Sequence, residues 1–222
     1  MVYVMSFFNK KPGIIKPEES DTPAYDKSAV NNIDETVNID PISNYNKKIT
    51  RNPLNPDLYY FRGNEKMKLE DYNGAIEDYD KALDLNHEFL DAYYNRGLAR
   101  IKLANIKGAL QDFTIVINRN PKYVPAYCNR GLAKRELGNY QGAIDDYTKA
   151  IELNPNYAEA FINRGNSRNE LKNYQGAVSD YNEALALKPN DAEIYRCRGK
   201  AKNFLGDKAG ARLDWSKADE LK

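Results

Sequence analysis

The chain contains little of what a reaction centre needs. Its 222 residues include one histidine, two cysteines and one tryptophan. The single histidine, His87, is expected at a turn between two helical units, so we expect no histidine-based triad, and one histidine cannot make a multi-histidine metal site within one chain. The GxGxxG and phosphate-loop spacings are also absent. We therefore expect a protein that is not an enzyme and that holds no cofactor and no metal.

Charge and hydropathy narrow the choice of partner. Basic and acidic side chains nearly balance, with a net charge of +1, so the chain has no broad attraction to nucleic acid or to anionic membranes. No apolar run is long enough to span a bilayer. The first eleven residues are mildly apolar but lack a basic leading region and a cleavage site, and Met5 is an alternative start. We expect a cytoplasmic protein without a nucleic-acid partner and without stable membrane insertion.

A repeat of 34 residues occupies most of the chain. Five glycines, each preceded by arginine, recur at this interval: Gly63, Gly97, Gly131, Gly165 and Gly199. An alanine row keeps the same interval: Ala75, Ala109, Ala143, Ala177 and Ala211. Such a period is typical of one supersecondary unit stacked on copies of itself. Cys128 and Cys197 belong to repeats two periods apart, so we expect free thiols.

Each repeat has the pattern of two antiparallel helices. In residues 124–157, small and aromatic residues recur at helical spacing until Gly138 breaks the run. A second helical pattern begins near Tyr140 and ends before Pro155, since proline lacks the amide that a helix needs. We expect the small side chains to let helices approach closely while the aromatic rings fill the core.

This pattern resembles the tetratricopeptide repeat, whose signature of aromatic, Gly, Ala, aromatic, Ala and Pro is present in the third repeat. The matching residues are Tyr127, Gly131, Ala143, Tyr147, Ala150 and Pro155. The resemblance covers five tandem repeats without insertion or deletion: residues 56–89, 90–123, 124–157, 158–191 and 192–222. It implies an all-α fold, a right-handed α-solenoid (superhelix) of five helix-turn-helix units.

Residues 1–55 do not share the period in this reading. They are rich in polar residues, and five prolines interrupt any helix: Pro12, Pro17, Pro23, Pro41 and Pro53. We predict a disordered, flexible N-terminal tail. An alternative is that Phe7, Phe8 or the stretch 39–45 docks as a short motif on a partner or on the array itself.

Two charged rows accompany the repeat. One row consists of Arg62, Arg96, Arg130, Arg164 and Arg198, and the other of Asp78, Asp112, Asp146, Asp180 and Asp214. We predict ion pairs between the rows, within a repeat or, preferably, from the aspartate of one repeat to the arginine of the next. A charged binding stripe is the alternative.

The two ends of the array differ. In the last repeat, polar residues replace apolar ones of the earlier repeats: Lys208, Arg212 and Asp219. Terminal repeats need a polar outer face, so we expect the last helix to act as a cap. The first repeat starts with bare aromatic residues at Tyr59, Tyr60 and Phe61, which the preceding segment is expected to cover in part.

One stripe of each first helix is not committed to packing. In tetratricopeptide repeat proteins this stripe lines a concave groove that holds peptides, and the resemblance implies the same here. The candidate peptide-binding residues are Tyr60, Asn64, Tyr94, Asn95, Leu98, Ile101, Cys128, Asn129, Leu132, Ile162, Asn163 and Asn166. An acidic rim beside them suits basic flanks on the peptide: Asp57, Asp91, Glu159 and Glu193.

Asn95, Asn129 and Asn163 form a row in three consecutive repeats. An amide offers a donor and an acceptor, so such a row could grip a peptide backbone about every third residue. In the alternative interpretation, these amides bond water or a neighbouring side chain.

These observations lead to one main hypothesis and two others. The main one is a non-catalytic adaptor or scaffold that binds an extended peptide or a partner protein segment. The second is a structural subunit that self-assembles into homo-oligomers through its uncapped first repeat or its tail. The third is regulation of a membrane-associated machine, with the apolar N-terminus as a loose tether.

Overall fold

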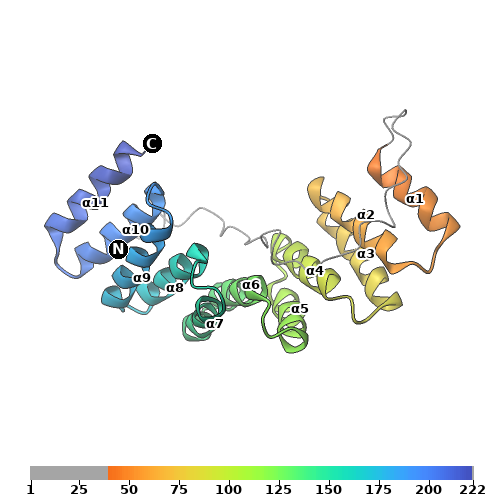
Figure 1. Ribbon diagram of the computed structural model, residues 1–222, viewed down its shortest axis with the longest axis horizontal. Helices are drawn as coiled ribbons and strands as arrows, with labels where there is room; N and C mark the ends of the chain where they lie inside the picture. Colours follow the sequence, from red (N-terminus) through yellow and green to blue (C-terminus); the bar gives the residue numbers. More distant parts are fainter. Residues whose placement is uncertain (1–39, 222) are drawn as a thin grey trace, which may run out of the picture. The chain divides into compact units, whose positions relative to one another are not determined.

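The computed structural model describes residues 40–221, and every regular element in this range is an α-helix (Figure 1). In chain order the helices are α1 (Pro41–Arg51), α2 (Pro56–Lys68), α3 (Tyr72–Leu85), α4 (Leu90–Lys102), α5 (Ile106–Arg119), α6 (Val124–Glu136), α7 (Tyr140–Leu153), α8 (Ala158–Glu170), α9 (Tyr174–Leu187), α10 (Ala192–Phe204) and α11 (Lys208–Glu220). The predicted all-α fold, with two helices in each repeat, is confirmed.

The described residues form two compact parts. The N-terminal part, residues 40–138, contains α1 to α6, and the C-terminal part, residues 139–221, contains α7 to α11. Within each part, successive helices pack against one another in chain order. None of the helices between residues 40 and 221 is long and apolar enough to cross a membrane.

A side-chain cap starts every second helix of the five repeats. The oxygen of an Asp or Asn accepts a hydrogen bond from the backbone N–H of a glycine three residues later, as in Asn105 with Gly108 at 3.1 Å. A Cβ on Gly108 would lie 2.9 Å from the Asn105 side chain, so glycine keeps this space open for the cap. The gain from such a cap, about 1 kcal/mol, offsets the low helix propensity of glycine.

Glycines of the first helices meet aromatic rings of the second helices. A Cβ on Gly97 would lie 2.7 Å from Cε1 of Phe113, and one on Gly165 would lie 2.8 Å from Cε1 of Tyr181. Both rings are completely buried. The predicted packing of small residues against aromatic residues in the core is therefore confirmed. Because glycine has no side chain, the aromatic ring can pack directly against the helix backbone.

The helix α1 was not expected, since we predicted a flexible tail up to residue 55. That prediction is wrong for residues 41–51. Pro41 stands at the start of the helix, where its missing N–H is not needed, and the Asp40 side chain accepts hydrogen bonds from the N–H groups of Ile42 and Ser43. Residues 1–39, including the motif proposed at Phe7 and Phe8, lie outside the described part of the chain.

The helix α1 packs against α2 and covers part of the aromatic start of the first repeat. Tyr45 stacks on Phe61 with ring centroids 6.3 Å apart, and Ile49 packs against the cluster that contains Tyr59. The expected partial cover of these aromatic residues is confirmed. At the other end of the array, the polar residues on α11 are exposed, as predicted for a cap: Lys208, Arg212 and Asp219.

The change Gly97→Ala is expected to destabilise the second repeat. Its new Cβ would overlap the Phe113 ring, and overpacking of this kind costs about 1–3 kcal/mol. Thermal unfolding followed by circular dichroism should therefore show a lower midpoint. Gln111→Ala, an exposed change on the neighbouring helix α5, is the control. Equal midpoints for the two variants would contradict the proposed role of the glycine.

Candidate functional site

The predicted peptide-binding residues lie on first helices in both parts of the molecule. Nine of them belong to α2, α4 and α6 of the N-terminal part, where α2 contacts α4 and α4 contacts α6. We call these nine residues the N-terminal stripe: Tyr60, Asn64, Tyr94, Asn95, Leu98, Ile101, Cys128, Asn129 and Leu132. The remaining three, Ile162, Asn163 and Asn166, lie on α8 of the C-terminal part.

Hydrogen bonds bring members of the N-terminal stripe together across consecutive repeats. The Nδ2 group of Asn95 donates to the Tyr60 hydroxyl at 3.2 Å and to Oδ1 of Asn64 at 2.9 Å. In the same way, Nδ2 of Asn129 donates to the Tyr94 hydroxyl at 2.9 Å. Each amide therefore bonds the tyrosine 35 residues earlier, which shows that the stripe residues of adjacent repeats share one face.

These bonds decide how two of the three asparagines are used. The N–H groups of Asn95 and Asn129 are engaged inside the protein, and Asn129 donates also to the carbonyl oxygen of Pro125 at 3.0 Å. This is the alternative interpretation, in which the amides bond neighbouring side chains. A ladder in which each amide offers both its donor and its acceptor to a peptide does not fit these two residues.

The stripe differs in accessibility along its length. The buried members are Tyr94, Leu98, Cys128, Asn129 and Leu132, with at most 6% of each residue exposed. The half-buried members are Tyr60, Asn64, Asn95 and Ile101, all on α2 and α4. On α8, the three predicted residues are half-buried. The accessible portion of the N-terminal stripe is therefore its α2–α4 end.

Tyr60 lies at the centre of this accessible end. Its ring centroid is 4.7 Å from that of Phe89 and 5.2 Å from that of Phe61. The pKa of Tyr60 is raised to about 12, chiefly by burial; the amides of Asn64 and Asn95 oppose this rise, and the nearby Asp91 carboxylate adds to it. The hydroxyl therefore stays protonated at neutral pH and is available to donate a hydrogen bond.

Some carboxylates of the acidic rim form ion pairs with basic side chains of the protein itself. In the C-terminal part, Glu159 forms an ion pair with Lys188, and Glu193 with Arg196. In the N-terminal part, Asp91 is half-buried, and it has no basic partner among the described residues. Because burial raises the pKa of Asp91, its carboxylate would gain from a cation supplied by a ligand.

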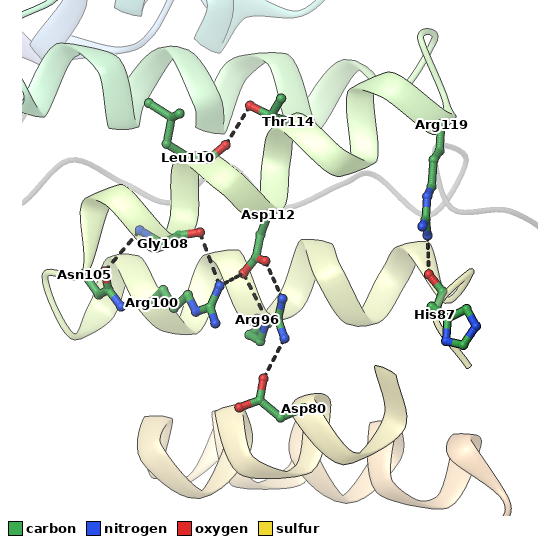
Figure 2. A network of polar contacts seen from close by, with 10 residues as sticks. All are labelled: Asp80, His87, Arg96, Arg100, Asn105, Gly108, Leu110, Asp112, Thr114 and Arg119. Atoms are coloured by element: carbon green, nitrogen blue, oxygen red, sulfur yellow. Dashed lines mark hydrogen bonds and ion pairs between the residues drawn. The ribbon is translucent and has the colours of Figure 1, made fainter. Parts of the chain in front are cut away.

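In four of the five repeats an arginine and an aspartate of the two rows form an ion pair, and Figure 2 shows the network around the pair of the second repeat. Nε and Nη2 of Arg96 donate to the two carboxylate oxygens of Asp112 at 3.1 and 2.6 Å, and Arg100 donates to the same carboxylate at 2.7 Å. The third group, Nη1 of Arg96, reaches back to Asp80 on α3 at 2.6 Å. Arg96 thus joins both helices of its own repeat to the repeat before it.

The preferred prediction, an aspartate paired with the arginine of the next repeat, is wrong for four of the five arginines. Their bidentate partner lies 16 residues later, in the same repeat: Arg62 with Asp78, Arg96 with Asp112, Arg164 with Asp180 and Arg198 with Asp214. The reason is position, because each arginine precedes the glycine that packs against its own second helix. These carboxylates are buried, which favours ion pairing over a charged binding stripe.

The polar residue that each arginine reaches in the preceding helix escaped prediction from the sequence. These partners are Asn46, Asp80, Thr148 and Asn182. They occur 34 or 68 residues apart, but their side chains differ in type. The one sequence signal for them is that a polar residue occupies this position of the 34-residue period in each case.

The fold and the stripe define a helical repeat protein built from hairpins, and in its N-terminal part the first helices share one face. Family comparison identifies the family. Tetratricopeptide repeat models match residues 91–123, 124–157 and 146–179, and a TPR repeat model matches residues 63–103 and 165–203. The chain belongs to the tetratricopeptide repeat family, a family of protein-interaction scaffolds.

Solved structures share this fold. A crystal structure of MamA protein has a TM-score of 0.71 and 24% identity, covering 75% of this chain and 91% of that one. YrrB, described as a TPR protein with an unusual peptide-binding site, has a TM-score of 0.68 and 21% identity, covering 80% and 92%. A tetratricopeptide repeat protein from Parabacteroides merdae ATCC 43184 has a TM-score of 0.72 and 23% identity, covering 82% and 72%. No curated protein sequence matches the chain.

Asp112→Ala is expected to lower the free energy of unfolding by about 3–5 kcal/mol, because it leaves two half-buried guanidinium groups without their carboxylate. Asp80→Ala removes a half-exposed partner of the same Arg96 and should cost less than about 1 kcal/mol. Urea titrations of both variants measure the difference. A loss of similar size in the two variants would contradict the prediction that the buried Asp112 carboxylate contributes more stability than the half-exposed Asp80 carboxylate.

The last repeat should show a pH dependence caused by Asp214. Burial alone would raise the pKa of Asp214, but the hydrogen bonds and charges of Arg198 and Lys202 outweigh it and lower the pKa below 3.8. A lowered pKa contributes stability that is present above the unfolded value and is lost as the pH falls through the folded value. The difference in unfolding free energy between wild type and Asp214→Asn should therefore stay constant down to about pH 4 and shrink below it. Shrinkage already near neutral pH would contradict this assignment.

Proposed function

We propose that this chain is a non-catalytic adaptor that binds an extended peptide or a partner protein segment along its first helices. In the N-terminal part, the observation that carries the proposal is the junction of Asn95 with Tyr60 and Asn64. It joins polar and aromatic groups of two consecutive repeats into one half-buried surface. The similar fold of YrrB, a TPR protein with an unusual peptide-binding site, supports this use of the fold.

The chemistry of this surface indicates the kind of segment it binds. Tyr60 and Ile101 offer apolar contact, and the Tyr60 hydroxyl offers a hydrogen-bond donor. Asp91 supplies a half-buried carboxylate without a basic partner among the described residues. A segment with an apolar side chain and a nearby lysine or arginine satisfies both. Affinity in the micromolar range suits a contact of this modest size.

The neighbouring hydrogen bonds set the limits of the site. Oδ1 of Asn64 already accepts from the Tyr79 hydroxyl at 2.8 Å and from Asn95 at 2.9 Å. Substitution of Asn64 would therefore disturb the packing of α3 as well as any ligand. Asp91 and Ile101 are better probes, because among the described residues neither side chain forms a hydrogen bond or an ion pair.

Selection of a displayed random peptide library on the immobilised full-length protein tests the proposal. Wild type should enrich peptides that combine apolar and basic side chains. Asp91→Asn should lose the preference for basic residues and bind the best peptide about fivefold more weakly, as expected for a partly exposed ion pair. Ile101→Glu should lose the apolar preference, whereas Glu77→Gln, an exposed change on α3, should behave as wild type.

Two outcomes would contradict the adaptor proposal at this site. One is that wild type enriches no family of peptides above the level of an unrelated helical protein. The other is that the enriched peptides bind Asp91→Asn and Ile101→Glu as tightly as Glu77→Gln. The alternative is a structural subunit that self-assembles through its first repeat or its tail, and the partial cover of that repeat by α1 makes it the less favoured proposal.

A further inference from the structure

One stripe of α11 has no helix packed against it in the described part of the chain. In the preceding repeat, the same stripe of α9 packs on the next first helix, where Tyr181 and Leu185 share a buried cluster with Ile194 of α10. Among the helices between residues 40 and 221, α11 contacts only α10, the first helix of its own repeat (Figure 1). The outer stripe of α11 consists of residues at helical steps of four, three and four: Lys208, Arg212, Trp215 and Asp219.

Trp215 is the member of the outer stripe that a simple polar cap does not explain. At its position in the four earlier repeats the aromatic residue is completely buried: Tyr79, Phe113, Tyr147 and Tyr181. In contrast, 37% of Trp215 is exposed. A Cβ on Gly199 would lie 2.6 Å from Nε1 of Trp215, so one edge of the indole ring is held against α10. The fold therefore orients a large aromatic ring and leaves part of it open to a partner.

The order of charges along the outer stripe is self-complementary. Lys208 and Arg212 precede Trp215, and Asp219 follows it, and all four residues are exposed. Because the spacing of four, three and four reads the same in both directions, the stripe is symmetric about its midpoint. When two such stripes lie antiparallel across a two-fold axis at this midpoint, Lys208 of each copy faces Asp219 of the other, and Arg212 faces Trp215. Each contact then occurs twice, as an interface between identical chains requires.

We propose that the outer stripe of α11 is a homodimer interface, in which two copies of the chain pair their stripes antiparallel. At the centre, the Arg212 guanidinium group lies on the exposed Trp215 ring of the other copy, a contact that suits its planar cation. At each end, Lys208 and Asp219 form an ion pair between the copies. Arginine and tryptophan at the centre, with charged residues at the rim, are typical of protein interfaces.

This dimer does not depend on peptide binding at the α2–α4 end, because α11 belongs to the other part of the molecule. The contact uses one helix from each copy and is small for a specific interface. We therefore expect a weak dimer, with a dissociation constant of about 100 µM.

Sedimentation equilibrium of the full-length protein, at concentrations on both sides of that value, should show a reversible monomer–dimer equilibrium. Trp215 is the only tryptophan of the chain, so its fluorescence reports on the proposed interface. The emission should shift to shorter wavelength as the concentration rises, because the ring leaves water. A chain that stays monomeric throughout would overturn the proposal, and so would a dimer without the fluorescence shift, since another surface would then form it.

Charge reversal tests the antiparallel register. Lys208→Glu places two carboxylates opposite each other twice in a dimer, and Asp219→Lys does the same with two ammonium groups. Each variant alone should therefore dimerise about tenfold more weakly than wild type. An equal mixture of the two variants should dimerise as wild type does, because both ion pairs of the heterodimer join opposite charges.

The matched control is Lys217→Glu, which reverses an exposed charge on the opposite side of α11 and should leave dimerisation unchanged. A mixture of Lys208→Glu and Asp219→Lys that stays monomeric would overturn the proposed pairing. Single variants that dimerise as tightly as wild type would overturn it as well. Because the mixture contains the same two polypeptides as the separate samples, its recovery cannot be attributed to a change in folding.

Discussion

Four of the repeat arginines, Arg62, Arg96, Arg164 and Arg198, each form a bridge on which the packing of the neighbouring helices depends. In the second repeat, Arg96 holds the buried Asp112 carboxylate through two N–H groups and reaches Asp80 in the preceding helix with a third. A guanidinium group can do this because its five donors point in fixed directions within one plane. A lysine at the same position would have neither the bidentate geometry nor the third contact. Each of these bridges therefore joins the two helices of one hairpin and also connects that hairpin to the helix before it.

The same register positions the surface that we assign to partner binding. The residue before the arginine, Asn95, projects its amide toward Tyr60 and Asn64 of the previous repeat. Polar groups that were candidates for ligand contact are in this way used for contact between repeats. In the proposed function, ligand recognition would use groups whose bonding is incomplete, above all the Tyr60 hydroxyl and the Asp91 carboxylate. The contacts between repeats and the proposed ligand contacts would then involve neighbouring residues of one helix.

The N-terminal region shows where reasoning from residue types alone went wrong. Pro41 was taken as evidence against a helix, yet a proline at the first helical position loses no hydrogen bond.

Sequence alone determined the helical class, the period, the helix boundaries near Gly138 and Pro155, and the packing of small residues against aromatic rings. All of these follow from local geometry and from spacing, which one chain displays in full. Only the tertiary structure decided which aspartate each arginine binds, that Asn95 and Asn129 donate inside the protein, and that Leu132 is buried while Ile101 is half-exposed to solvent. Those outcomes depend on distances and directions between side chains on different helices. A periodic sequence repeats every candidate partner at the same interval, so spacing cannot choose among them.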